Sequence, residues 1–188
     1  MRNIWHDIDP RCITPESFTA VIEIPKGSKK KYELDKHTGL IRLDRILYTS
    51  THYPANYGFI PRTYADDGDP LDVLVLCTEI LDPLVEVECY PIGVIRMIDS
   101  DEVDDKIIAI PFEDPSWNSY QDIGELPPHY SNEISHFFEV YKGLEHKHTA
   151  TSDVLDRTRA ADVIRDCMRR YEVHFCGRRP EKEARAEE

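Results

Sequence analysis

Residues 66–73 read DDGDPLDV, so that Asp67, Asp69 and Asp72 surround one Gly and one Pro. Carboxylates this close repel one another and raise one another's pKa unless a cation lies between them. The segment is therefore either an ordinary turn solvated by water or a site where metal ions hold the carboxylates together. No His is near in the sequence, which disfavours zinc, whereas hard cations such as Mg²⁺ prefer oxygen ligands. The turn alone leaves both interpretations open.

A calcium-binding EF-hand loop does not fit this turn. That loop needs oxygen ligands at positions 1, 3 and 5, Gly at position 6 and Glu at position 12. Counted from Asp67, these last three positions hold Leu71, Asp72 and Thr78. The EF-hand interpretation is therefore rejected.

A second acidic run, DSDEVDDK, covers residues 99–106 between two predicted strands. By itself it is typical of a charged, solvated hairpin loop. In a small sheet structure, however, two acidic turns can meet at one end. Residues 31–35 (KYELD) place Lys31, Glu33 and Asp35 on one strand face, which predicts either a solvated face or one wall of a polar cleft.

The elements that would position these side chains are short strands and two helices. A period-two pattern predicts strands over residues 18–25, 31–35, 40–45, 71–76, 85–98 (two stretches broken near Pro91 and Gly93) and 106–110. Residues 53–59 (YPANYGF) are interpreted as a packed loop, and helical periodicity starts at Ser131 and at Ser152. Frequent turn residues favour an antiparallel barrel over a doubly wound sheet.

Composition narrows the class of protein. The 188 residues, 40% of them hydrophobic, predict one domain over residues 1–177 and a charged, disordered tail over 178–188. A net charge of −13 opposes binding to nucleic acid or to an anionic membrane, and it repels a small anionic substrate unless cations intervene. Five cysteines without a C-x-x-C motif, and no export signal or long apolar run, predict a cytoplasmic protein with reduced thiols.

Several motifs together resemble the soluble inorganic pyrophosphatases, the family with a D-G-D-P-x-D-V signature, in its short prokaryotic-type form. The motifs occur along the chain in the same order as in the family. They are IEIP at 22–25, KYE at 31–33, DR at 44–45, YPANYGF at 53–59, DGDPLDV at 67–73, Asp99, DDK at 104–106 and FFEVYK at 137–142. Together they extend over roughly residues 18 to 144, so a chance match of all these motifs is an unsatisfactory explanation.

The resemblance implies an OB-like five-stranded barrel with flanking helices and a Mg²⁺-dependent hydrolase that splits pyrophosphate into two phosphates. Several ions per site are implied, with Mn²⁺ or Zn²⁺ as substitutes, and Asp69 would be the base for a water that bridges two of them. It also implies a homo-oligomer, in the form of a homohexamer. The implied metal ligands are Asp67, Asp72, Asp99 and Asp104, with Glu23 and Glu33 acting through metal-bound water. The implied phosphate-binding residues are Lys31, Arg45, Tyr57, Lys106, Tyr141 and Lys142.

One position departs from the family pattern. Ser100 stands where relatives often carry an acidic residue, so that Asp101, Glu102 or Asp105 could supplement the third metal site. Two rival hypotheses remain: the same site acting on organic diphosphates or polyphosphates, and an OB-like module that binds nucleic acid or a protein. The second needs a basic groove with stacking aromatics, which the acidic composition opposes.

Overall fold

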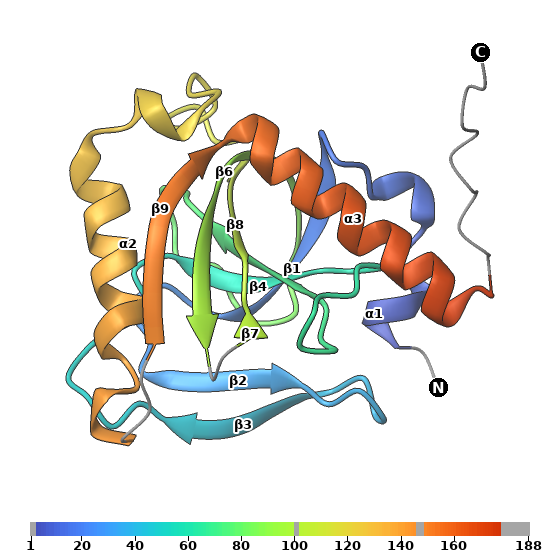
Figure 1. Cartoon of the computed structure of the whole chain (residues 1–188), viewed down its shortest axis with the longest axis horizontal. Coiled ribbons are helices and arrows are strands. Elements are labelled where there is room, and N and C mark those ends of the chain that lie inside the picture. The colour runs from blue at the N-terminus through green and yellow to red at the C-terminus, as the bar shows by residue number, and fades with distance from the viewer. Residues whose placement is uncertain (1–2, 100–101, 146–148, 178–188) are drawn as a thin grey trace, which may run out of the picture.

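The structure is a computed structural model that describes residues 3–99, 102–145 and 149–177. Five strands form a closed ring of hydrogen bonds (Figure 1). In order around the ring they are β1 (Phe18–Ile24), β4 (Asn56–Ile60), β5 (Leu71–Val75), β8 (Lys106–Pro111) and β6 (Glu86–Asp99), which pairs back with β1. The predicted strand-rich architecture with helices is therefore correct, and the tail expected to be disordered lies outside the described residues.

One ring pair differs from the antiparallel sheet that the sequence predicts. β5 and β8 run parallel, with Asp72 opposite Lys106, whereas the other ring pairs are antiparallel. A parallel pair needs a long crossover connection, and here β6 with its return through β7 (Glu102–Val103) supplies it. This parallel register places Asp72 beside Lys106.

The strand β6 is longer and more continuous than predicted. It stays one strand through Pro91 and Gly93, where its pairing with β8 shifts register. Such an irregularity bends a strand and increases its twist, so that β6 can also pair with β1, β7 and β9 (Thr149–Asp156).

Three strands were missed by the sequence prediction: the two-residue β7 inside the second acidic run, and the longer β4 and β9. β4 occupies part of the expected packed loop, and its Gly58 is required because a Cβ there would lie 1.9 Å from the carbonyl oxygen of Val21. β9 contains Ser152, where a helix was expected. The helix α3 (Arg157–Phe175) begins only after Asp156, whose carboxylate accepts a hydrogen bond of 2.9 Å from the Arg159 N–H as an N-cap.

The helix predicted from Ser131 begins earlier. α2 (Pro128–Val140) has Pro in its first turn and no side-chain cap, which is consistent with the fixed φ of proline favouring a helix start. The remaining elements are α1 (Ile4–Asp7), the hairpin strands β2 (Lys30–Leu34) and β3 (Ile41–Ile46), and the 3₁₀ turns η1 (Pro10–Cys12), η2 (Ile123–Glu125) and η3 (Gly143–Glu145).

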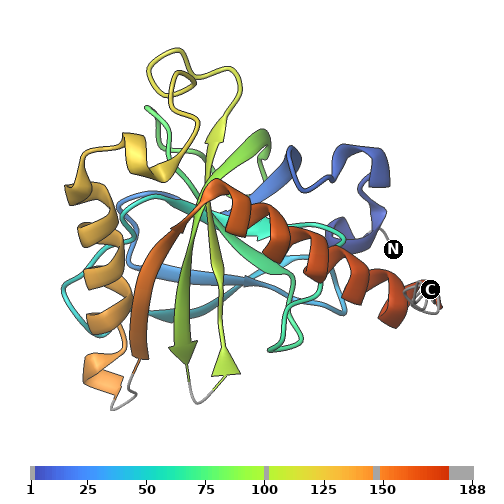
Figure 2. The ribbon, with the colours of Figure 1, turned by 45° about the horizontal axis from the view of Figure 1, so that its top comes forward.

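Alternate residues of the ring strands pack into separate cores. Leu74 and Ile108 join the cluster that includes Phe138 of α2. Val73 and Ile107 join the cluster that includes Ile164 of α3. Figure 2 shows α2 beside β9, and α3 running obliquely away from the C-terminal end of β9. The period-two alternation thus buries both faces of β5 and β8.

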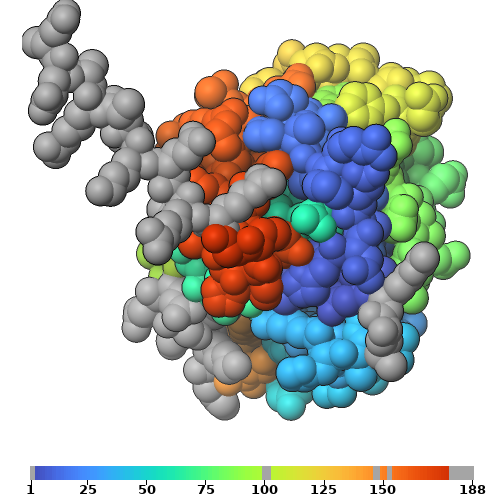
Figure 3. All heavy atoms as spheres, turned by 90° about the vertical axis from the view of Figure 1, so that its right-hand side faces the viewer, coloured from blue at the N-terminus to red at the C-terminus, as the bar shows by residue number. Residues whose placement is uncertain are grey.

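The N-terminal segment packs against the end of α3. In Figure 3 the start of the described chain lies beside the C-terminal turns of that helix, and the rings of Trp5 and Phe175 are 5.1 Å apart in an edge-to-face arrangement. All five cysteines are free, as predicted. Within the described part of the chain, no helix has the length and apolar character needed to cross a membrane.

Candidate active site

A polar cavity of about 260 Å³ lies where the β2–β3 hairpin meets the ends of the ring strands. Its walls are formed by Glu23, Lys31, Tyr32, Glu33, Leu34, Lys36, Tyr57, Phe59, Asp67, Asp69, Pro70, Asp72, Asp104, Lys106, Tyr141 and Lys142. The structure therefore brings together every residue predicted for the site except Arg45, and the side chain of Asp99 lies outside the described residues.

Lys106 forms the centre of the polar contacts. Its ammonium is buried and donates hydrogen bonds to Asp72 Oδ2 at 2.6 Å, to Asp104 Oδ1 at 2.8 Å and to the Tyr57 hydroxyl at 3.2 Å. The Tyr57 hydroxyl itself donates to Asp72. Burial alone would lower the pKa of Lys106, but the Asp72 and Asp104 carboxylates outweigh it and raise that pKa well above its ordinary value. These two carboxylates therefore face one common cation position.

The turn at residues 67–69 presents two further carboxylates. Gly68 has a φ of +81°, a conformation that glycine adopts without strain, and the Asp69 N–H donates to Asp67 Oδ1 at 3.0 Å. Burial, together with repulsion from Asp72, Asp69 and Asp104, raises the pKa of Asp67 to about 6. The backbone bond from Asp69 opposes that rise. A cation bound among these carboxylates would reverse the effect.

Glu23 is the most deeply buried carboxyl group of the cavity, with 6% of the residue exposed. Burial and the neighbouring Asp72 raise its pKa to about 8, although a 2.7 Å bond accepted from the Leu34 N–H favours the charged form. The side chain thus binds protons or a nearby cation more readily than an exposed glutamate does.

The β2–β3 hairpin brings basic side chains to the acidic turn. Lys31 pairs with Glu33 and lies 3.5 Å from an Asp44 oxygen. Lys36 pairs with Asp69 and donates to the Gly68 carbonyl at 3.2 Å. Sequence reasoning missed Lys36, because it lies in the turn after the strand pattern. Its place in the hairpin turn next to the KYELD motif is the only sequence signal.

Arg45 does not line the cavity in this structure. Its Nε donates to Glu145 Oε1 at 2.9 Å and its Nη1 binds Asp44. Its Nη2 is buried and, among the described residues, has no hydrogen-bond partner. A buried donor without an acceptor is costly, so this nitrogen is suited to bind an added oxygen ligand.

The second acidic run is only partly described. Asp99 ends β6 and pairs through its backbone with Glu102 and Thr149, but its side chain lies outside the described residues, as do Asp101 and the Glu102 side chain. Asp105 faces away from the cavity and binds Arg96 with both carboxylate oxygens. Asp105 is one of three alternatives for the third metal site, beside Asp101 and Glu102, and the choice among them stays a prediction. In this arrangement both Asp105 oxygens are bound to Arg96.

The carboxylates are close, but they are not arranged as a ready metal site. Across the described ranges, no group of three or more His, Cys, Asp or Glu side chains has a geometry that could hold a metal ion. The Lys106 ammonium lies between Asp72 and Asp104, and Lys36 binds Asp69. The donor set, oxygen-rich and lacking His and Cys, still fits Mg²⁺ in type.

A small strand ring with carboxylates and cations gathered at one end defines the class of phosphate-processing hydrolases, for which charge neutralisation and positioning are the main requirements. A profile described as inorganic pyrophosphatase matches residues 20–172. The chain therefore belongs to the inorganic pyrophosphatase family, and its reaction is hydrolysis of inorganic pyrophosphate.

Individual relatives agree with this assignment. The chain is 49% identical over 175 residues to soluble inorganic pyrophosphatase 2 of Chlamydomonas reinhardtii, covering 93% of this chain and 91% of that protein. It is 52% identical to soluble inorganic pyrophosphatase 4 of Arabidopsis thaliana, over 89% of this chain and 77% of that protein. The inorganic pyrophosphatase of Thermus thermophilus superposes with a TM-score of 0.83 at 42% identity, over 91% of this chain and 99% of that one.

Proposed function

We propose that the 260 Å³ cavity is where pyrophosphate is hydrolysed with Mg²⁺ as cofactor and Mn²⁺ or Zn²⁺ as substitutes. The observation that carries this proposal is Lys106, whose ammonium lies between two carboxylates and a tyrosine hydroxyl. That arrangement places a phosphate-binding cation next to carboxylates that can hold metal ions, which is what a dianionic leaving group requires.

Asp67, Asp72 and Asp104 are the proposed direct metal ligands, with Asp99 as a fourth. Glu23 and Glu33 would act through metal-bound water at the rim. Bound Mg²⁺ would neutralise phosphate charge and lower the pKa of the attacking water. Support comes from the raised pKa of Asp67, because burial and, to a lesser extent, repulsion from Asp72, Asp69 and Asp104 disfavour its charge when no cation is bound.

Phosphate oxygens are bound in this proposal by cations and hydroxyl donors of the cavity wall. Lys31, Lys106 and Lys142 supply ammonium groups, and Tyr57 and Tyr141 donate hydroxyl protons without adding charge. Arg45 lies outside the cavity wall, and its buried Nη2, without a hydrogen-bond partner among the described residues, would become a further donor after its side chain turns toward the cavity. When substrate enters, Lys106 exchanges part of its contact with Asp72 and Asp104 for phosphate oxygens and releases carboxylate oxygens for metal ions.

Asp69 is the proposed base. It stands on the turn between Asp67 and Asp72, lines the cavity and is about half exposed, so that an attacking water can reach it. It accepts the proton of that water as the new phosphorus–oxygen bond forms and the bridging phosphorus–oxygen bond breaks, with the electron pair of the broken bond leaving on the second phosphate. Lys36, which now binds Asp69, would turn to the product phosphate as the carboxyl group becomes neutral.

The proposal includes the form of the strand ring, the compartment and the oligomeric state. The strand ring is read as an OB-like barrel, with the β5–β8 pair as its parallel seam. The protein is expected to work in the cytoplasm as a homohexamer. Sedimentation at micromolar protein concentration tests the last point, since a monomer mass near 22 kDa would reject it.

A phosphate-release assay tests the function directly. With pyrophosphate and millimolar Mg²⁺ we expect turnover that disappears in EDTA and returns when Mg²⁺ is restored. ATP and tripolyphosphate serve as competing substrates. If either is hydrolysed as fast as pyrophosphate, the site acts on phosphoanhydrides in general and the narrower specificity is wrong.

A further inference from the structure

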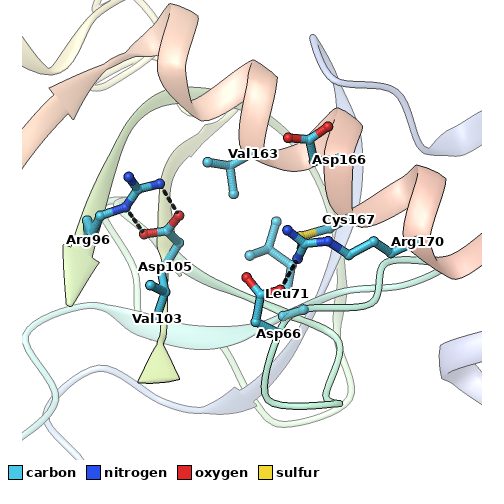
Figure 4. A pocket seen from close by; sticks show the side chains of 10 residues that line it. Asp66, Leu71, Arg96, Val103, Asp105, Val163, Asp166, Cys167 and Arg170 are labelled. Carbon is cyan, nitrogen blue, oxygen red and sulfur yellow. Dashed lines mark hydrogen bonds and ion pairs between the residues drawn. The ribbon is translucent and has the colours of Figure 1, made fainter. Parts of the chain in front are cut away.

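A second cavity, of about 210 Å³, lies behind the two acidic segments, between α3 and the strands β5, β6 and β7 (Figure 4). We name it the rear pocket; its charged lining residues are Asp66, Arg96, Asp105, Asp166 and Arg170. Two of these carboxylates are chain neighbours of residues in the active-site cavity. Asp66 precedes Asp67, and Asp105 follows Asp104.

Each of these neighbouring carboxylates is bound by an arginine on the rear side. Arg170 Nη1 of α3 lies 2.9 Å from Asp66 Oδ1. Arg96 of β6 binds Asp105 through two bonds, Nε to Oδ1 at 2.9 Å and Nη2 to Oδ2 at 2.8 Å. Figure 4 shows the two pairs on opposite sides of the pocket. None of the four paired residues lines the active-site cavity.

The position of these pairs couples them to the metal-ligand candidates. In extended backbone, successive side chains point to opposite sides. Asp104 and Lys106 face the active-site cavity while Asp105, between them, faces the rear pocket. Holding Asp105 from behind therefore fixes the direction of Asp104, and holding Asp66 fixes the start of the turn that carries Asp67.

The pairs also sort six carboxylates into two groups. Asp67, Asp69, Asp72 and Asp104 remain in the cavity, whereas Asp66 and Asp105 are neutralised behind it. A freely moving Asp66 would add repulsion to the acidic turn. An isolated, exposed Arg–Asp pair contributes little to stability. We therefore expect these pairs to act mainly by fixing the positions of the neighbouring side chains.

We propose that Arg170 and Arg96 are positioning residues of the cation site, which act through Asp66 and Asp105 on the cavity-facing Asp67 and Asp104. This inference rests on the proposed metal-binding function. It concerns the affinity for Mg²⁺ in the absence of substrate, and it leaves the chemical step to the cavity residues.

The experiment measures Mg²⁺ binding by calorimetry to the full chain without pyrophosphate. Variants are Arg170→Leu, Arg170→Lys and Asp66→Asn, with Arg96→Gln for the second pair. Arg169→Leu is the matched control, because Arg169 is the preceding residue of α3, is 67% exposed and pairs with Asp166 rather than with Asp66. Both leucine variants remove one positive charge from the same helix turn.

Loss of positive charge alone strengthens binding of a cation, so Arg169→Leu should leave the Mg²⁺ dissociation constant unchanged or lower it. Arg170→Leu should raise that constant about tenfold, the lower end of the usual effect of outer-shell changes on metal affinity. Asp66→Asn should raise it similarly, and the Arg170→Leu/Asp66→Asn double variant should add nothing, since both changes break one pair. Arg170→Lys should restore part of the affinity, and kcat at saturating Mg²⁺ should stay within about twofold of wild type in all of them.

Equal Mg²⁺ affinity in Arg170→Leu, Arg96→Gln and Arg169→Leu overturns the inference while the proposed function stands. Wild-type protein that hydrolyses pyrophosphate independently of Mg²⁺ and binds none overturns both. Circular dichroism spectra matching wild type confirm that each variant is folded. If Arg96→Gln does not fold, the Arg170 series decides alone.

Discussion

The active-site cavity and the rear pocket lie on two sides of the same acidic segments, and they hold carboxylates in different ways. In the cavity, one ammonium is shared: Lys106 contacts Asp72 and Asp104 together. In the rear pocket, each carboxylate has its own guanidinium, Asp66 with Arg170 and Asp105 with Arg96. Aspartates next to each other in the sequence therefore have different surroundings.

This difference follows from the chemistry of the two cations. A lysine ammonium is a compact point charge on a flexible stem, so it can shift between carboxylate and phosphate oxygens. An arginine fork binds a carboxylate in a fixed plane, as Arg96 does with two bonds to Asp105. Exchangeable contacts suit a site that binds metal and substrate, whereas fixed contacts suit its support.

Removal of the shared ammonium should give the largest effect. Lys106→Met leaves the partly buried Asp72 and Asp104 without their cation. We expect a loss of about 3 kcal/mol of unfolding free energy in EDTA, near the lower end for breaking a buried ion pair. Millimolar Mg²⁺ should recover part of it, because a bound metal replaces the missing charge. Urea unfolding with and without Mg²⁺ measures both values.

The control for this variant is Lys30→Met, which removes an exposed lysine at the start of β2. It should change the unfolding free energy by less than about 0.5 kcal/mol. If Lys106→Met is equally mild in EDTA, the shared ammonium is not needed to hold these carboxylates together.

The second largest effect should be a difference in turnover between substitutions of Asp69, which lines the active-site cavity, and Asp66, which lines the rear pocket. Asp69→Asn should lower the turnover of pyrophosphate by about 10² or more, the usual scale for loss of a general base, while the fold is retained. Asp66→Asn, three residues earlier, should keep kcat at saturating Mg²⁺ within about twofold. Phosphate release at several Mg²⁺ concentrations separates the two. Unaltered hydrolysis by Asp69→Asn would show that this residue is not the base.

The sequence predicted the ring strands β1, β5 and β8 because their apolar residues alternate and turn residues bound them. It missed β4 because YPANYGF combines Pro, Asn and Gly, which are typical of a loop. The need for Gly58 there arises from the close approach of Val21, a contact between distant segments. It missed β9 because the helical pattern beyond Asp156 was extended backwards to Ser152.

The candidate site was predictable as a set of residues but not as a geometry. Motif order identified residues that do line one cavity, among them Asp67, Asp72 and Lys106. It could not show that Lys36 pairs with Asp69, since that contact depends on how the hairpin lies over the turn. It assigned Asp104 as a metal ligand but left Asp105 open as a supplement, because which side Asp105 faces depends on the direction of the backbone there.

The pH dependence of stability tests the buried end of the cavity. Glu23 has a pKa of about 8 in the folded chain against 4.5 ordinarily, chiefly because burial disfavours its charge. The folded state thus holds a proton that the unfolded state releases, and stability falls as pH rises between these values, by about 1.4 kcal/mol per pH unit. In EDTA, wild type should lose about 2 kcal/mol more than Glu23→Gln between about pH 6 and 7.5.

Glu23→Gln keeps an oxygen that can accept the hydrogen bond from the Leu34 N–H, so a change in packing does not confuse the comparison. Denaturant midpoints at each pH give the two slopes. Parallel slopes for the two proteins would mean that Glu23 is not protonated in the folded state. Excess Mg²⁺ should reduce the difference, because a cation near Glu23 favours its charged form.

The smallest effect should come from the rear pocket, where Arg170 and Asp66 are both substantially exposed, at 39% and 53% of their side chains. Arg170→Leu should lower the unfolding free energy in EDTA by no more than about 1 kcal/mol, the upper range for an exposed ion pair. Arg96→Gln should cost more, because Asp105 is only 9% exposed and would lose a bidentate partner. Urea midpoints of the two variants, measured beside Lys106→Met, rank the three contacts. If Arg170→Leu destabilises the chain as much as Lys106→Met does, its pair with Asp66 supports the whole fold, and any loss of Mg²⁺ affinity in that variant would reflect unfolding rather than the direction in which Asp67 points.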